Sequence, residues 1–232
     1  GIEEFVDVRP TQGGLAGYWY WVVGNTTDSS WTWGIQAPWV MLLNPQGFIG
    51  AQRTYPSDYR GHLAKAAIDL PDGGLAIGGV SWRPDPQMSA PPDGWLMRLN
   101  WIGDVVWSRS LYGPNSEWIT SIAYQQFNAG GVAQELIAYA GYSAKELGMR
   151  DWVDAPWVGM IDGNGTGLWQ RTIEHENRVS QWFDGVALTP ADGSVIATGT
   201  RRTPAVLGND DAVIVRFPSF GGVMPTWQRA YG

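Results

Sequence analysis

Residues Trp95–Gly113, WLMRLNWIGDVVWSRSLYG, decide the fold of this chain. An apolar run ends at Leu99, a short polar turn follows, and a second β-rich run covers Val105–Leu111. Two runs of β-branched and aromatic residues around a turn with glycine are typical of a β-hairpin. The stretch therefore predicts two antiparallel strands joined by a tight turn at Asn100–Gly103.

The same hairpin occurs four times. The other copies are Trp39–Tyr55 (WVMLLNPQGFIGAQRTY), Trp157–Ile173 (WVGMIDGNGTGLWQRTI) and Ala212–Tyr231 (AVIVRFPSFGGVMPTWQRAY). A further pair of β-rich runs, joined by an Asp-Gly or Gly-Gly turn, precedes each copy. The repeat is about 55–62 residues long and contains four expected strands, which is the sequence signature of a repeat architecture.

Four antiparallel strands repeated four times predict an all-β, four-bladed β-propeller, because such sheets must stack face to face to bury their apolar sides. We expect a single domain over residues 1–232, with whole blades and no shared closing strand, at about 1–60, 61–116, 117–179 and 180–232. Either the fourth blade packs against the first, or the missing neighbour is another chain. In the second case an end blade with an uncovered apolar face would bind a neighbour, and the unit would be a module of a longer chain or a self-associating subunit. Helical propensity occurs at Gln134–Leu136 and at Ala144–Leu147, but the register of the repeat overrides it, and we expect at most one helical turn, at Ala144–Leu147 inside a loop.

The composition excludes several classes of function. The formal net charge is −7, which disfavours a nucleic-acid partner because phosphate backbones would be repelled. No apolar run approaches the roughly 20 residues needed to span a bilayer, so no membrane insertion is expected. The chain has no cysteine, which excludes disulfides and thiolate chemistry, and it has two histidines. With 31 glycines and 15 tryptophans, it fits a β-protein with tight turns and large packing side chains.

The fourth strand of each repeat carries a recurring tryptophan, except for Ala51 in the first copy. These tryptophans are expected to dock one blade on the next: Trp107, Trp169 and Trp227. The pattern Leu99-Asn100-x-x-Gly103-x-x-x-Trp107 recurs from Ile161 to Trp169 and resembles the tryptophan-docking repeats of quinoprotein-like propellers. Together with Asp-Gly-Gly before the second strand and Trp-x-Arg-x-Tyr on the fourth, the chain resembles secreted or surface β-propeller repeats of bacterial proteins. The resemblance implies the propeller fold and an extracellular or cell-surface location.

Long connections between the second and third strands are expected on one face of the ring: Asn25–Pro38, Ser81–Gly94, Ser143–Pro156 and Arg201–Asp210. Long loops on a rigid scaffold commonly carry binding residues. Five aromatics in or beside them are binding candidates, Trp31, Trp33, Trp82, Tyr142 and Trp152, because such rings stack on sugars or anchor protein partners. The alternative is that they pack locally against the blade edges.

Metal ligands and modification sites are only weakly indicated. His62 near Asp58, Glu174-His175-Glu176 and Asn209-Asp210-Asp211 can equally be solvated loop residues, and we expect no metal or cofactor. Asp162-Gly163-Asn164-Gly165 resembles a calcium loop but occupies the expected tight turn. Two glycosylation sequons begin at Asn25, at the start of a long exposed loop, and at Asn164, in that turn.

No catalytic constellation follows from the spacing of the residues. The leading hypothesis is a non-catalytic extracellular or surface scaffold whose partner is a glycan, a neighbouring module or another copy of the chain. The alternative is a propeller enzyme, either a glycoside hydrolase or lyase or a quinoprotein relative, with an axial active site. The recurring Arg53, Arg109, Arg171 and Arg229 are expected as charges on edge strands that discourage sheet extension, whereas an axial position would favour the enzyme.

Overall fold

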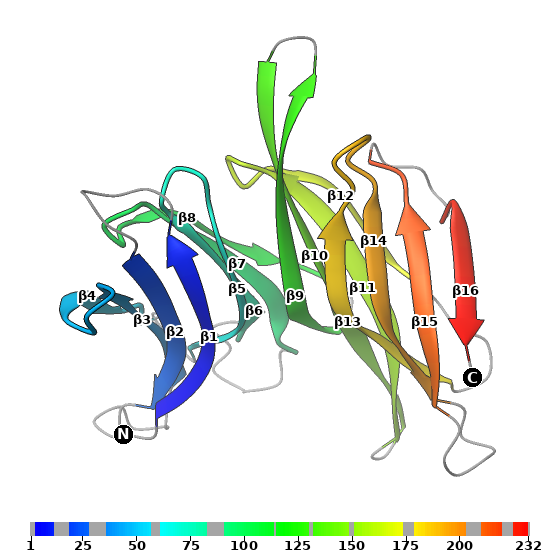
Figure 1. The fold of residues 1–232 in the computed structure, drawn as a ribbon. Helices are drawn as coiled ribbons and strands as arrows, with labels where there is room; N and C mark the ends of the chain where they lie inside the picture. The colour runs from blue at the N-terminus through cyan, green and yellow to red at the C-terminus, as the bar shows by residue number, and fades with distance from the viewer. Residues whose placement is uncertain are drawn as a thin grey trace. The chain divides into compact units, whose positions relative to one another are not determined.

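The computed structural model describes residues 3–11, 19–27, 36–56, 61–82, 91–113, 115–129, 132–148, 151–173, 179–202, 210–219 and 225–231. Regular secondary structure in these ranges consists of strands (Figure 1). The chain divides into two compact units, residues 1–112 and 113–232. Each unit contains two four-stranded antiparallel sheets.

In the first unit, one sheet has the order β1-β2-β3-β4 and the other the order β5-β6-β7-β8. The strands of the first sheet are β1 (Glu3–Thr11), β2 (Trp19–Thr27), β3 (Gln36–Leu43) and β4 (Ile49–Thr54). Those of the second are β5 (His62–Asp69), β6 (Leu75–Ser81), β7 (Asp93–Leu99) and β8 (Val105–Leu111).

In the second unit, the strands of the third sheet are β9 (Ser116–Ala129), β10 (Val132–Gly148), β11 (Asp151–Asp162) and β12 (Gly167–Thr172). Those of the fourth are β13 (Ser180–Leu188), β14 (Val195–Arg202), β15 (Asp210–Phe217) and β16 (Trp227–Tyr231). Every sheet is built from four consecutive strands and shares none, which confirms the four predicted four-stranded units. The radial arrangement of these sheets as a propeller and the single domain over residues 1–232 stay predictions.

The turn between the third and fourth strands is built alike in three sheets. Its first residue is Asn44, Asn100 or Asp162, and its side-chain oxygen accepts hydrogen bonds from the backbone N–H groups two and four residues later. The fourth residue is a glycine with φ between 79° and 84°, a region that side chains with a Cβ rarely adopt. The predicted turn at Asn100–Gly103 is therefore confirmed.

A β-bulge interrupts the first strand of every sheet. On the second strand a glycine faces each bulge, and in three sheets an added Cβ would lie within 2 Å of a backbone carbonyl oxygen: Gly79 against Leu63, Gly141 against Trp118 and Gly199 against Trp182. Only glycine permits this approach. The bulged first strand and its glycine are thus part of the repeat.

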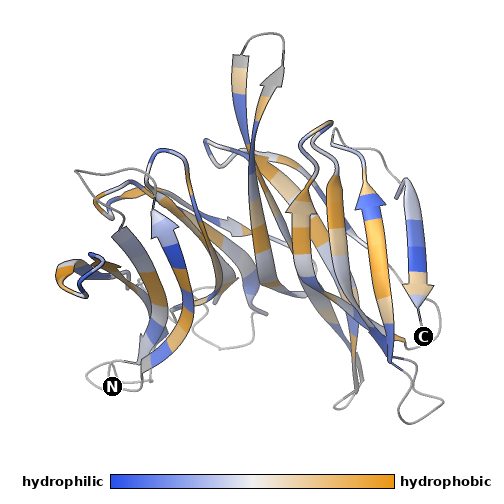
Figure 2. Ribbon diagram, viewed as in Figure 1, coloured by the Kyte–Doolittle hydropathy of each residue, from blue (hydrophilic) through white to orange (hydrophobic). Residues whose placement is uncertain are grey.

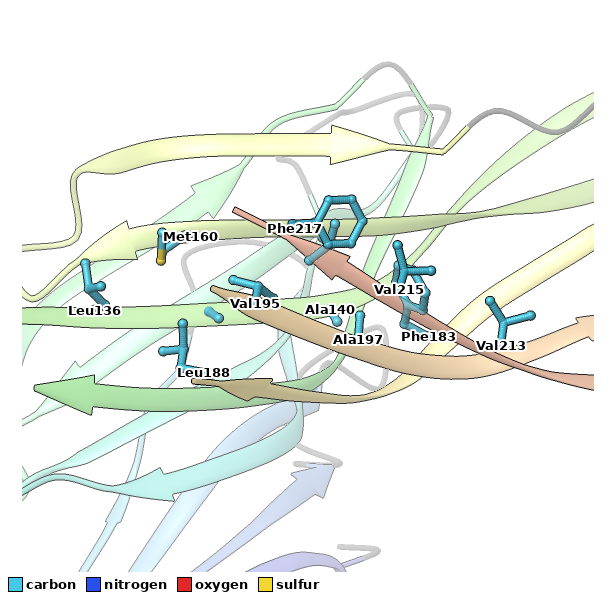
Figure 3. Packing of buried hydrophobic residues seen from close by; sticks show 12 residues of the cluster. Leu136, Ala140, Met160, Phe183, Leu188, Val195, Ala197, Val213, Val215 and Phe217 are labelled. Atoms are coloured by element: carbon cyan, nitrogen blue, oxygen red, sulfur yellow. The ribbon is translucent and has the colours of Figure 1, made fainter. Parts of the chain in front are cut away.

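Each unit buries its core between its two sheets. In the second unit Ala140 and Met160 pack against Phe183, Val195 and Val215 (Figure 3). In the first unit Trp21 and Val40 pack with Ile77, Trp95 and Met97 in the same way. The hydrophobic middle of β15 contrasts with hydrophilic residues in the middle of the edge strand β16 (Figure 2). Core residues therefore come mainly from the first three strands of each sheet.

The third sheet differs from the prediction at residues 143–156. A long loop with a helical turn was expected there, but β10 continues through Ala144–Leu147 and pairs with β11 as far as Gly148↔Asp151. Both predictions are wrong because cross-strand pairing supplies more hydrogen bonds than one isolated helical turn, so tertiary pairing overrides local helix propensity. At its other end the β9–β10 hairpin extends beyond β11, whose pairing with β10 begins only at Leu136.

The tryptophans of the fourth strands occupy different environments. Trp169 donates its indole N–H to the carbonyl oxygen of Ser219 at 3.0 Å and packs near Phe217 of the fourth sheet. Trp107 is buried, whereas Trp227 on β16 is 38% exposed. Fourth strands thus do not carry one uniform packing residue.

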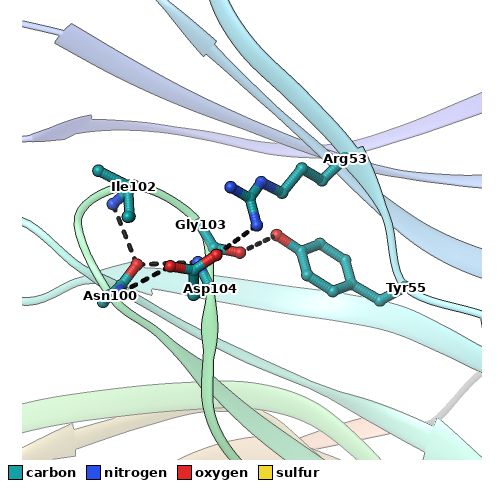
Figure 4. A network of polar contacts seen from close by, with 6 residues as sticks. All are labelled: Arg53, Tyr55, Asn100, Ile102, Gly103 and Asp104. Atoms are coloured by element: carbon teal, nitrogen blue, oxygen red, sulfur yellow. Dashed lines mark hydrogen bonds and ion pairs between the residues drawn. The ribbon is translucent and has the colours of Figure 1, made fainter.

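In the first sheet, where Ala51 replaces the tryptophan, two other side chains of the first unit make the contact with the next sheet (Figure 4). Arg53 pairs with Asp104, and the hydroxyl of Tyr55 donates to the carbonyl oxygen of Gly103 at 2.7 Å. Burial raises the pKa of Tyr55 to about 12. Arg53, Arg109, Arg171 and Arg229 all lie on strands at the edge of their sheets, as expected.

Candidate binding site

Polar residues recur at one level of the sheets, next to the connections between second and third strands. We call this level the polar rung. It comprises the paired residues Glu3–Thr26–Ala37, His62–Ser81–Asp93, Glu117–Ser143–Ala155 and Gln181–Arg201–Asp211. The first strand contributes an ionisable or amide side chain in every sheet. Burying such groups is costly unless they are hydrogen-bonded, so their partners determine what the rung can do.

In the first unit the groups at this end are engaged. His62 stacks on Trp95 with the ring centroids 4.5 Å apart. The Asn25 amide donates to the carbonyl oxygen of Ala64 at 3.0 Å and accepts from the Ala64 N–H at 2.8 Å. Asn25 is only 2% exposed within β2, so the expectation of an exposed sequon there is wrong. The amide nitrogen that would carry a glycan is used to join the two sheets.

On the third sheet the rung is also hydrogen-bonded. Glu117 is fully buried, and one carboxylate oxygen accepts from the hydroxyl of Ser143 at 3.0 Å and from the N–H of Asn115 at 3.1 Å. The Asn115 amide donates to the same hydroxyl at 3.0 Å. This carboxylate is held by contacts that fix the end of β9.

Aromatic side chains lie one residue further along the third sheet. Trp118 and Tyr142 are cross-strand partners, and their half-buried rings stack with centroids 6.1 Å apart and planes 8° apart. Side chains alternate between the faces of a strand, so Tyr142 shares the face of Ala140, which packs against Phe183 of the fourth sheet. The aromatic pair therefore faces the fourth sheet.

The same alternation places three polar residues of the fourth sheet on the face that looks toward the Trp118–Tyr142 pair. Gln181 lies two residues before the core residue Phe183, and Asp211 lies two residues before Val213. In the strand register, Arg201 on β14 lies opposite Gln181 on β13 and opposite Asp211 on β15. Contact between the sheets at this level is direct, because the Thr120 hydroxyl donates to the carbonyl oxygen of Phe183 at 2.6 Å. The aromatic pair and these polar residues form one layer immediately outside the core.

Gln181 stands out in this layer. It is 0% exposed, and within the part of the chain that the structure describes neither its amide oxygen nor its amide nitrogen has a hydrogen-bond partner. The buried Nε of Arg201 likewise has none there. An unsatisfied buried polar group costs about 1–3 kcal/mol. A native fold that retains such groups points to a water or ligand that completes them.

Charged residues surround the layer. Arg202 lies 5.2 Å from the centroid of the Trp182 ring and pairs with Asp210 at 3.1 Å. The Asp154 N–H donates to the hydroxyl of Ser180 at 3.3 Å. Burial raises the pKa of the Asp154 carboxyl, and nearby Arg202 partly opposes the shift. Burial, with the Asp154 charge, also raises the pKa of Tyr142.

A hollow lies where the β9–β10 hairpin extends past β11. It is open, has a volume of about 630 Å³, and its lining includes Gln126, Gln134, Glu135, Asp162, Asn164 and Leu168. Its two carboxylates take part in local contacts. Glu135 accepts from the hydroxyl of Tyr124, and Asp162 accepts from two N–H groups of its own turn. The residues resembling a calcium loop thus build a tight turn.

The remaining predicted site residues are dispersed. Trp31, Trp33, Asp58, His175 and Asn209 lie outside the described residues. Trp82 is half-buried beside β6, and its backbone N–H donates to the carbonyl oxygen of Gly61 at 3.3 Å. Trp152 lies on β11, and Asn164 is exposed in its turn. Of the two candidate aromatics whose side chains the structure describes, Trp82 and Tyr142, Tyr142 lies in the unsatisfied layer.

The sequence interpretation missed Trp118, Gln181 and Arg201. A usable signal existed, because His62, Glu117 and Gln181 are polar residues that directly precede an apolar or aromatic residue at the same level of three repeats. The cross-strand pairing of Gln181 with Arg201 and the packing of the third sheet against the fourth depend on residues far apart in the sequence.

No family model matches the chain, and no curated protein matches it. Among the described residues, no helix is long and apolar enough to cross a membrane. Within those same ranges, no three His, Cys, Asp or Glu side chains are grouped to hold a metal ion. The function must therefore be inferred from the site itself.

Proposed function

We propose that this chain is a non-catalytic binding and assembly scaffold that works outside the cell or at its surface. The observation that carries the proposal is the layer between the third and fourth sheets, where a half-buried aromatic pair faces an unsatisfied amide. Apolar rings combined with a few fixed polar groups are typical of ligand sites. The carboxylates of Glu117 and Asp162 instead support structural hydrogen bonds, which favours binding over acid–base chemistry.

Exposed apolar side chains on edge strands and turns support the assembly part of the proposal. Phe48 is 71% exposed, Val106 is 55% exposed, and Trp101 is 48% exposed. Apolar groups on an unpaired sheet edge favour contact with another chain. The resemblance to secreted and surface propeller repeats supports the proposed location.

Three measurements test the proposal. Sedimentation velocity across a wide range of concentrations measures self-association, a glycan array measures carbohydrate binding, and fractionation of the source cells measures location. We expect concentration-dependent association or array binding, and recovery in the surface or secreted fraction. A monomer that stays inert at high concentration and binds nothing on the array would overturn the proposal.

A further inference from the structure

We propose that a neutral saccharide binds in the second unit between the Trp118–Tyr142 pair and the polar residues Gln181, Arg201 and Asp211. This inference rests on the proposed binding function and names its ligand class and its site. We call these five residues the saccharide layer.

The two rings supply a stacking surface. Trp118 and Tyr142 are parallel within 8° and remain half-buried, although the neighbouring Ala140 is fully buried. A flat aromatic surface that keeps part of its area accessible suits the apolar face of a sugar ring, which loses hydration when it stacks.

The polar side supplies donors and acceptors together. Gln181 offers an acceptor oxygen and two N–H donors, Arg201 offers donors, and Asp211 offers acceptors. A sugar hydroxyl both donates and accepts, so neighbouring hydroxyls can satisfy the amide oxygen and nitrogen of Gln181 at once. An apolar ligand would leave the amide unsatisfied. The layer holds the cation of Arg201 beside the carboxylates of Asp211 and Asp154, so its charges do not select an anion, and a neutral polar ligand fits it.

The first unit offers a comparison for the position of Tyr142. Gly24 on β2 lies opposite Trp39 on β3, and Gly141 on β10 lies opposite Trp157 on β11, so the two glycines are equivalent positions of their sheets. The next residues, Asn25 and Tyr142, are therefore equivalent as well. Asn25 reaches across to the facing sheet and pairs with both backbone groups of Ala64. In the second unit a tyrosine at this position makes no such bond to Phe183, the counterpart of Ala64, and the facing Gln181 stays unsatisfied. The Asn25 amide therefore has its oxygen and its nitrogen hydrogen-bonded, whereas neither atom of the Gln181 amide has a partner among the described residues.

The test is isothermal titration of the full chain with cellohexaose, xylohexaose, mannohexaose and maltohexaose. Gln181→Leu replaces the amide by an apolar group of similar volume, so it should weaken binding about tenfold or more while raising the melting temperature. Trp118→Ala should weaken binding at least as strongly. Trp227→Ala removes a partly exposed tryptophan of the same unit, on the edge strand β16 and outside the saccharide layer, and is the matched control, with an unchanged dissociation constant.

Each contrary result has a distinct meaning. If a hexasaccharide binds but Gln181→Leu and Trp118→Ala both bind it as tightly as the wild type, the site is wrong while the binding function stands. If the wild type self-associates but binds none of the four sugars, the saccharide inference is overturned and the assembly function remains. If the wild type neither associates nor binds, both proposals fail.

Discussion

Gly141→Ala tests the bulge that shapes the first strand of the third sheet. An added Cβ would lie 1.8 Å from the carbonyl oxygen of Trp118 and 3.1 Å from the Cα of Ile119, whereas real Cβ contacts stay beyond 3.0 Å. Both neighbours are backbone atoms, so no side-chain rotation relieves the overlap. The backbone of β9 must move by more than 1 Å relative to β10, which the surrounding hydrogen bonds resist.

The cost follows from what that movement disrupts. Ladder hydrogen bonds beside the bulge and the bond from Thr120 to Phe183 would be strained or lost, at about 1 kcal/mol each. The tight packing of Ala140 against the fourth sheet would loosen as well. We expect a total loss of about 3–5 kcal/mol in the free energy of unfolding, among the largest effects of single substitutions.

The assay is urea denaturation followed by tryptophan fluorescence, with calorimetry as a second measurement. Gly167→Ala is the matched control in the same unit, because an added Cβ there meets nothing within 4 Å. It should stay within about 0.5 kcal/mol of the wild type. If Gly141→Ala is as stable as Gly167→Ala, the bulge in β9 and the described register of β9 with β10 are refuted.

Three further changes test contacts in the two units. Asn25→Leu leaves the buried N–H of Ala64 without its side-chain partner, and we expect a loss of about 2–3 kcal/mol by denaturation, whereas unchanged stability would contradict the sheet-joining role. Trp169→Phe should cost about 1–2 kcal/mol through its lost hydrogen bond, against about zero for the exposed Trp227→Phe; equal losses would refute the difference between them. The pKa of Tyr55 is raised from 10.0 to about 12, so the unfolded chain releases this proton first and the stabilisation falls as pH rises from about 10 to about 12. Stability measured across that range should decline less in Tyr55→Phe, and identical pH profiles would contradict the shift.

Strand positions followed closely from the sequence because their signals are local. The turns at Asn44, Asn100 and Asp162 depend on one side chain and one glycine a few residues apart, so repeat comparison located them correctly. The four-stranded units followed from the same comparison. The extension of β10 through Ala144–Leu147 did not, because local residue preferences favour a helix there and only pairing with β11 overrides them.

The repeat, the turns and the alternation of side chains follow from the sequence, since each depends on residues close together in the chain. The tertiary structure decided which of those side chains meet. Tyr142 was visible as an aromatic residue, but its stacking on Trp118 and its position opposite Gln181 require two strand pairings and the packing of two sheets. Asn25 illustrates the same limit, because its sequon is local whereas its burial against Ala64 joins residues 39 positions apart. Burial and hydrogen-bond partners are set by such distant contacts, and these decide whether a polar residue holds the fold together or remains available to a ligand.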